Sequence, residues 1–154
     1  MHVNGTELEV ASLRAVAPAD GSDVLQAGPL LVADGRVVVS EGDDREGFSA
    51  GAHQFDSDIT VGRYPRAALG VGDGRVLAVA CDGRADDEAG LTLSELAQVL
   101  VKLGARSAIN LDGGGSASLV CDGQLWNRPR EEHGLELAGG RPISTALVFT
   151  PRLT

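Results

Sequence analysis

The residues with the clearest capacity for chemistry lie in one short stretch, Asn110-Leu111-Asp112-Gly113-Gly114-Gly115-Ser116. There an amide, a carboxylate and a hydroxyl surround three consecutive glycines, directly after the apolar segment 107–109. Consecutive glycines can adopt positive φ and let a ligand approach backbone N–H groups, which together form a concavity suited to an anion. A tight turn is the alternative, because Asp-Gly is a common hairpin signal. Three glycines exceed what a two-residue turn needs, so the pattern favours an anion-binding site.

Carboxylates and arginines elsewhere in the chain fit the same chemistry. Asp82, like Asp112, follows an apolar segment and precedes glycine. Two carboxylates in different environments can supply a general acid and a base or nucleophile, and the planar guanidinium of arginine can bind two oxygens of an anion at once. Taken singly, Asp82-Gly83 also fits an ordinary turn and each arginine a solvated surface charge. The candidates are Asp112 and Asp82 for catalysis, and Arg63, Arg66, Arg84, Asn110, Gly113, Gly114, Gly115, Ser116, Asn127, Arg128, Arg141 and Ser144 for binding a substrate or its phosphate.

Other chemistries have little support in the sequence. His2, His53 and His133 stand in unrelated settings without the spacing of metal ligands or of a catalytic triad. The chain contains neither a GxxxxGK[ST] phosphate loop nor a GxGxxG turn. We therefore predict no metal ion and no cofactor.

Composition narrows the class of partner. The 154 residues carry a formal net charge of −9, which argues against nucleic-acid and anionic-membrane surfaces because both rely on excess Lys and Arg. Any phosphate must be met by a local cluster of positive charge. The sequence shows neither the apolar segment of a signal peptide nor a run near 18 apolar residues, and it leaves the cellular compartment open. A homo-oligomer or a complementing second chain is also left open.

Repeated hairpin signals predict an antiparallel sheet. Asp-Gly separates the apolar segments 30–33 and 36–39, again 67–71 and 75–80, and again 117–121 and 124–126. Asp-Gly between apolar runs is typical of a type I′ turn, in which both central residues have positive φ. A last strand is expected at 145–149. Residues 1–24 are predicted to be an irregular leader or edge segment ahead of a domain at 25–154, and the acidic segment 41–62 a loop that borders or covers a site.

One helix is expected at about 92–103. Thr92 and Glu95 form a capping box, and leucines and an alanine then recur on one face. Gly104 follows as the residue that ends the helix. Hairpins with one strong helix favour an α+β fold over a parallel βαβ fold. Cys81 and Cys121 are expected to be buried free thiols, with a disulfide between neighbouring strands as the alternative.

Several segments of the sequence, taken together, resemble the phosphodiester glycosidase family. The resemblance rests on the stretch 110–116 together with Tyr64-Pro65-Arg66, Asp82-Gly83-Arg84, the helix, and the segments 126–129 and 141–144, in that family's order from about Leu25 to Phe149. It implies hydrolysis of a sugar-1-phosphodiester at the glycosidic side, which releases the sugar and leaves a phosphomonoester. It also implies that the glycine run and arginines stabilise the leaving phosphate while Asp112 or Asp82 acts at the sugar, with Asp112 favoured.

The resemblance also implies an upstream Asn-Gly-Gly-Phe-like segment, where this chain has only Val3-Asn4-Gly5-Thr6. A compact enzyme, a subunit completed by another chain, and a carbohydrate or sugar-phosphate binding module without catalysis all fit this difference.

Overall fold

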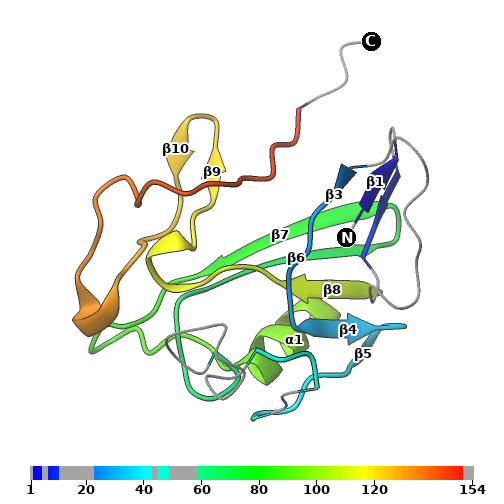
Figure 1. Cartoon of the computed structure of the whole chain (residues 1–154), viewed down its shortest axis with the longest axis horizontal. Helices are drawn as coiled ribbons and strands as arrows, with labels where there is room; N and C mark the ends of the chain where they lie inside the picture. Colours follow the sequence, from blue (N-terminus) through cyan, green and yellow to red (C-terminus); the bar gives the residue numbers. More distant parts are fainter. Residues whose placement is uncertain (1, 5–6, 11–22, 43–44, 49–58, 151–154) are drawn as a thin grey trace.

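A five-stranded antiparallel sheet with one helix forms the body of the protein (Figure 1). The computed structural model describes residues 2–4, 7–10, 23–42, 45–48 and 59–150. The sheet has the strand order β5-β4-β8-β6-β7. Its strands are β4 (Leu30–Ala33), β5 (Arg36–Val37), β6 (Arg66–Gly72), β7 (Arg75–Cys81) and β8 (Ser107–Asn110). Since β8 pairs antiparallel with both β4 and β6, the predicted α+β class is confirmed.

Two smaller sheets flank this body. The strands β1 (His2–Asn4), β2 (Glu7–Glu9) and β3 (Asp23–Val24) pair in the order β2-β1-β3. The strands β9 (Val120–Cys121) and β10 (Gln124–Leu125) form a hairpin. In Figure 1 the β1–β3 sheet lies near the turn of the long β6–β7 hairpin, and the β9–β10 hairpin lies towards the opposite, open end.

The predicted Asp-Gly turns are confirmed at all three positions. Asp34, Asp73 and Asp122 have φ of 51°, and the glycine after each has φ between 71° and 74°. Positive φ at both central residues is the type I′ geometry that suits the twist of antiparallel strands. Because the second residue of each turn needs this conformation, glycine there relieves strain that a side chain would add.

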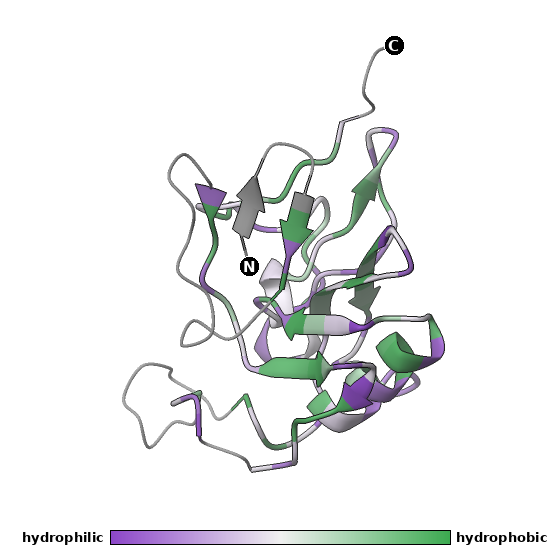
Figure 2. Cartoon of the chain, turned by 90° about the vertical axis from the view of Figure 1, so that its right-hand side faces the viewer, coloured by the Kyte–Doolittle hydropathy of each residue, from purple (hydrophilic) through white to green (hydrophobic). Residues whose placement is uncertain are grey.

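Successive side chains along each strand point to opposite faces of the sheet, so buried apolar residues lie on both faces. Ala68 and Ala108 pack with the helix α1 (Leu93–Lys102), whereas their neighbours Leu69 and Ile109 pack on the other face with Val10 and partly buried apolar residues. Figure 2 shows hydrophobic residues concentrated along the central strands and the helix, with hydrophilic residues at the turns. A side-chain period of two accounts for this division.

The helix α1 begins and ends close to the predicted limits. Thr92 Oγ1 accepts the Glu95 N–H at 3.2 Å while the Glu95 carboxylate accepts the Thr92 N–H at 3.0 Å, which completes the capping box. The helix ends at Lys102, with Leu103 as its C-cap and Gly104 at a φ of 94° directly after it. In the part of the chain that the structure describes, no helix is long and apolar enough to cross a bilayer.

Replacing Leu96 with alanine is expected to lower the free energy of unfolding by about 2–5 kcal/mol, because this leucine is fully buried and truncation leaves a cavity. Urea denaturation followed by circular dichroism measures the change. The matched control is Gln98→Ala on the exposed face of α1, for which we expect a change within about 0.5 kcal/mol. Equal effects of the two substitutions would contradict the packing described here.

The capping box also makes stability depend on pH. Hydrogen bonding from the Thr92 backbone, with a further contribution from Arg63, lowers the pKa of Glu95 from its ordinary value. A lowered pKa in the folded state adds stability above the ordinary carboxyl pKa, and this stability is lost as the pH falls through the lowered value. We expect Glu95→Gln to remove that part of the acid sensitivity, as measured by urea denaturation at several pH values. Parallel wild-type and variant curves would show that the cap does not contribute.

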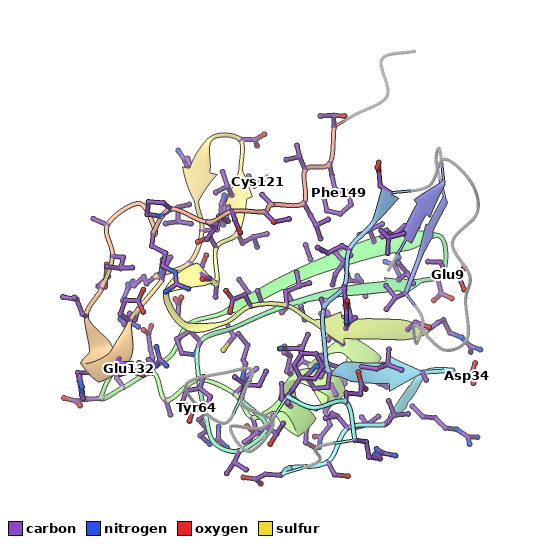
Figure 3. The ribbon with its side chains drawn as sticks, viewed as in Figure 1. Glu9, Asp34, Tyr64, Cys121, Glu132 and Phe149 are labelled. Atoms are coloured by element: carbon purple, nitrogen blue, oxygen red, sulfur yellow. The ribbon has the colours of Figure 1, made fainter. Side chains whose placement is uncertain are left out.

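The expectation of a last strand is wrong. Residues 141–150 form no regular secondary structure, so the strand expected at 145–149 is absent. In the described part of the chain no strand pairs with this segment. Val148 and Phe149 are 78% and 55% exposed, and only Leu147 of this segment packs against the apolar cluster that includes Leu69 and Ile109. Figure 3 shows Phe149 on the segment that runs out towards the C-terminus.

The cysteines differ in part from expectation. Both thiols are free, as preferred, but Cys121 on β9 is exposed and only Cys81 on β7 is partly buried. They belong to different sheets and not to neighbouring strands. Burial raises the pKa of the Cys81 thiol above its ordinary value, and the nearby Asp82 carboxylate raises it further.

The segment predicted as an acidic loop and the N-terminal segment lie partly outside the described residues. Of the loop at 41–62, residues 43–44 and 49–58 are not described, and of the N-terminal segment, residues 1, 5–6 and 11–22 are not. In the described part, the Glu46 carboxylate accepts the Leu30 N–H at 3.1 Å. Glu46 and Arg45 also line a cavity of about 200 Å³ with residues of β4 and the segment after β5.

Candidate active site

The glycine stretch directly follows β8 at the open end of the β6–β7 hairpin. Strand β8 ends at Asn110, and Gly114–Ser116 form the short 3-10 helix η2. The Leu111 N–H donates to the Ala67 carbonyl at 2.8 Å, and the Gly114 N–H donates to the Pro65 carbonyl at 3.1 Å. These two bonds hold the bend formed by residues 111–116, called the glycine bend below, against the start of β6.

An atom from a different part of the chain lies close to each of the three glycines. A Cβ on Gly113 would lie 2.8 Å from the Pro65 carbonyl oxygen, and a Cβ on Gly114 would lie 2.9 Å from Arg84 Nη1. A Cβ on Gly115 would overlap Glu131 Oε1. Since real Cβ atoms do not approach so closely, the absence of side chains lets three separate segments meet at the bend.

Four of the six backbone N–H groups of the glycine bend have partners inside the protein, which leaves fewer free donors than the expected anion cradle. Besides the Gly114 N–H on Pro65, the Gly113 N–H donates to Asp112 Oδ1 at 2.9 Å and the Ser116 N–H donates to the Gly113 carbonyl at 3.1 Å. Buried N–H groups take the partners that tertiary contacts offer. In this structure the main effect of the glycines is therefore to let other segments of the chain come close to the bend, and not to present a row of free N–H donors.

A carboxylate and a guanidinium face each other at the exposed side of the bend. The Asp112 side chain is 77% exposed, and its Oδ2 lies 3.8 Å from Arg141 Nη2. The same guanidinium donates to the Ser116 hydroxyl and, through Nη1, to Glu131 Oε1 at 2.9 Å. Three of the predicted residues, Asp112, Ser116 and Arg141, thus form one cluster.

Arg84 is held against the bend with its charge unneutralised. Its Nη1 donates to the Arg130 carbonyl at 3.2 Å, and its guanidinium lies over the Tyr64 ring, 5.4 Å from the centroid. Among the described residues no carboxylate lies within 4.0 Å of it, whereas Arg63, Arg128, Arg130 and Arg141 each have at least one. Arg84 has a φ of +60°, an uncommon conformation for a residue with a side chain that collects at functional sites. Arg84 therefore keeps donors and charge available for an anion.

Arg66, by contrast, is enclosed in the protein. It is 2% exposed, and its Nε, Nη1 and Nη2 atoms donate to the carbonyls of Leu91, Ile59 and Gly62 at 2.9–3.2 Å. Burial lowers its pKa to about 10, which leaves it charged at neutral pH. A guanidinium whose three nitrogens all bind the backbone supports a structural role rather than the expected phosphate contact.

Asp82 connects two of the sequence blocks. Its Oδ1 accepts the Arg128 backbone N–H at 2.6 Å, and a Cβ on the following Gly83 would lie 2.7 Å from the Pro65 nitrogen. The Arg128 side chain points to Glu88, with Nη1 3.7 Å from its carboxylate. Asp82 thus joins residues 127–130 to the end of β7, and this contact supports positioning more than direct chemistry.

The two asparagines are tied to the backbone. Asn127 accepts the Leu119 N–H at 2.8 Å and donates to the Ala117 carbonyl at 2.7 Å, so it braces the chain after the bend. Asn110 is buried and donates to the Gly28 and Leu111 carbonyls, while its Oδ1 has no partner among the described contacts. Ser144 is exposed, and the structure does not bring it to the cluster by any described hydrogen bond.

Three residues at the site were not among the candidates named from the sequence, although Tyr64 stands in one of the segments that resemble the family. Glu131 contacts the bend, Arg130 is buried between Glu88 and Glu136, and Tyr64 lies beside two guanidiniums (Figure 3 labels Tyr64). The pair Glu131-Glu132 gives no signal in the sequence because adjacent glutamates are typical of solvated loops. Within the described ranges no group of three or more His, Cys, Asp or Glu side chains is placed to hold a metal ion.

Comparison with known proteins gives a consistent result. The family model described as phosphodiester glycosidase matches residues 2–150. The curated N-acetylglucosamine-1-phosphodiester alpha-N-acetylglucosaminidase of Bos taurus is 40% identical over 58 residues, which are 38% of this chain and 11% of that protein.

Solved structures also resemble the chain. A hypothetical protein from Synechocystis has a TM-score of 0.50 and 36% identity, covering 73% of this chain and 19% of that one. The catalytic domain of zebrafish N-acetylglucosamine-1-phosphodiester alpha-N-acetylglucosaminidase, auto-inhibited by its pro-peptide, has a TM-score of 0.49 and 21% identity, covering 73% and 39%. This chain spans less than two fifths of each of the three relatives. Because the family model extends over nearly its whole length, the chain belongs to the phosphodiester glycosidase family.

Proposed function

We propose that this protein is a hydrolase that cleaves a sugar-1-phosphodiester at the glycosidic side, releasing the sugar and a phosphomonoester. One observation carries the proposal: Arg84, a guanidinium without a carboxylate partner among the described residues, lies against the glycine bend that also carries the exposed carboxylate of Asp112. This combination matches a substrate that has an anion beside a centre where positive charge develops.

Arg84 is the group proposed to receive the phosphate. When the bond between the anomeric carbon and the phosphate oxygen breaks, the electron pair and the growing negative charge go to the phosphate. A guanidinium with free N–H donors stabilises that charge by charge-assisted hydrogen bonds, which strengthen as the charge grows. The hydrogen bond to the Arg130 carbonyl and the Tyr64 ring hold Arg84 in place before substrate binds.

Asp112 is the carboxylate proposed to act at the sugar. Glycoside cleavage passes through a transition state in which the anomeric carbon resembles an oxocarbenium ion, and a carboxylate beside it stabilises that positive charge. The hydrogen bond from the Gly113 N–H fixes one oxygen of Asp112, and the other lies 3.8 Å from Arg141 Nη2 on the exposed side of the bend. Asp82 is the weaker candidate, since it is less exposed than Asp112 and its carboxylate links residues 127–130 to the end of β7.

The substrate class follows from the family and from the bovine relative. That relative is named for N-acetylglucosamine-1-phosphodiester, so we take an N-acetylglucosamine-1-phosphate diester as the first substrate to test. The test incubates the protein with methyl diesters of N-acetylglucosamine-1-phosphate and of glucose-1-phosphate and measures free sugar and phosphomonoester. We expect equal amounts of the two products from wild type.

Two outcomes would redirect the proposal. Turnover by wild type that is no faster than that of Asp112→Asn would contradict it. Saturable binding of the diester in calorimetry without product would instead favour a module that binds the diester at this site without catalysis.

A further inference from the structure

Glu131 lies on the glycine bend although nothing in the mechanism above uses it. Its Oε1 occupies the space that a Cβ on Gly115 would fill, and its carboxylate is one third exposed. The backbone around it is fixed: the Glu131 N–H donates to the Leu135 carbonyl at 2.9 Å, and the Gly134 N–H donates back to the Glu131 carbonyl at 3.3 Å. The backbone of this loop therefore places the Glu131 side chain beside the bend, where Arg141 binds it.

One guanidinium joins Glu131 to Asp112. Arg141 Nη1 is 2.9 Å from Glu131 Oε1, and Arg141 Nη2 is 3.8 Å from Asp112 Oδ2. Oxygens on the two terminal nitrogens of one guanidinium are at most about 9 Å apart, which does not exceed the largest separation, roughly 9.5 Å, between the two carboxyl groups of glycosidases. Asp112 and Glu131 are thus close enough to act on the same substrate.

The leaving group decides which role the second carboxylate can fill. Many glycosidases need an acid to protonate the departing oxygen. A phosphomonoester leaves as a stabilised anion, because its second proton has a pKa of about 6, and Arg84 is available to neutralise it. The remaining demand is a base for the attacking water.

We propose that Glu131 is a second catalytic residue, which accepts a proton from the water that attacks the anomeric carbon. This inference rests on the proposed function. The water oxygen bonds to the anomeric carbon, the bond from that carbon to the phosphate oxygen breaks, and the electron pair leaves with the phosphate. The proton goes from the water to the Glu131 carboxylate and then to solvent, while Asp112 stabilises the charge on the sugar.

The first test compares Glu131→Gln with wild type on the N-acetylglucosamine-1-phosphate methyl diester. Glutamine keeps the shape and an oxygen that accepts from Arg141, but it is not a base. We expect kcat to fall about 10²- to 10⁴-fold with KM within about threefold. The matched control is Glu132→Gln, an exposed glutamate on η3 (Glu132–Gly134) at the outer edge of the molecule in Figure 3, for which kcat stays at the wild-type value.

The second test separates a base from a residue that only positions Arg141. Azide is a nucleophile that needs no deprotonation, so it is expected to restore turnover of Glu131→Ala and to yield a glycosyl azide detectable by mass spectrometry. A role limited to positioning predicts that Glu131→Gln stays active and that azide has no effect.

An active Glu131→Gln variant, or a Glu131→Ala variant that azide does not rescue, would overturn the proposal for Glu131. Turnover by wild type would still support the proposed function in either case. A wild type without turnover on the diesters would overturn the proposed function and this inference together.

Discussion

Asp112→Asn is expected to reduce kcat for the sugar-1-phosphate diester by about 10²- to 10⁴-fold. Asparagine has the same shape and can still accept the Gly113 N–H, so the bend keeps its geometry while the negative charge beside the anomeric carbon is lost. Because the side chain is largely exposed, we expect the free energy of unfolding to change by no more than about 0.5 kcal/mol. Steady-state kinetics and urea denaturation on the same preparation measure both quantities.

The control for this variant is Asp122→Asn. Asp122 is an exposed aspartate in the β9–β10 turn with a φ of 51°, a conformation that asparagine tolerates well. The Asp122→Asn variant removes the same charge from a residue outside the glycine bend. Its activity should stay within about twofold of wild type. A loss of activity shared by the two variants would assign the effect to net charge and contradict the role of Asp112.

Arg84→Met is the second substitution with a large expected effect. Removing the guanidinium takes away the cation proposed to receive the leaving phosphate, and we expect kcat to fall about 10²- to 10³-fold, as for other donors aimed at a developing anion. Methionine keeps part of the apolar stem beside the Tyr64 ring. The rate of hydrolysis over a series of diesters measures the loss.

Arg84→Lys should retain part of the activity that Arg84→Met loses. Lysine keeps a positive charge but cannot bind two oxygens at once as the guanidinium of arginine does. Arg36→Met, at an exposed arginine on β5, is the control and should leave kcat unchanged. Equal activity of Arg84→Met and wild type would show that the phosphate is bound elsewhere.

The regular parts of the fold were predictable because their signals are local. The capping box of Thr92 and Glu95 and the Asp-Gly turns depend on residues a few positions apart. The expected strand at 145–149 failed for the opposite reason. A strand needs a neighbour to pair with, and an apolar pattern such as Ala146-Leu147-Val148 does not say whether an edge is available to it.

The site was predictable in location but not in detail. The triple glycine marks the place where distant segments meet, but the Gly113 and Gly114 N–H groups donate to Asp112 and Pro65, and such partners cannot be read from the run itself. Arg66 and Arg84 look alike in the sequence, and only tertiary burial shows that the first is saturated by backbone carbonyls.

The roles proposed for Arg84 and Asp112 require that the bond between the sugar carbon and the phosphate oxygen is the one that breaks. Hydrolysis of the N-acetylglucosamine-1-phosphate methyl diester in water enriched with ¹⁸O tests this most directly, with the methyl phosphate product read by its ³¹P resonance and its mass. We predict methyl phosphate without ¹⁸O, since water attacks carbon. Methyl phosphate that carries ¹⁸O would mean attack at phosphorus and would contradict the roles given to the glycine bend, Arg84 and Asp112.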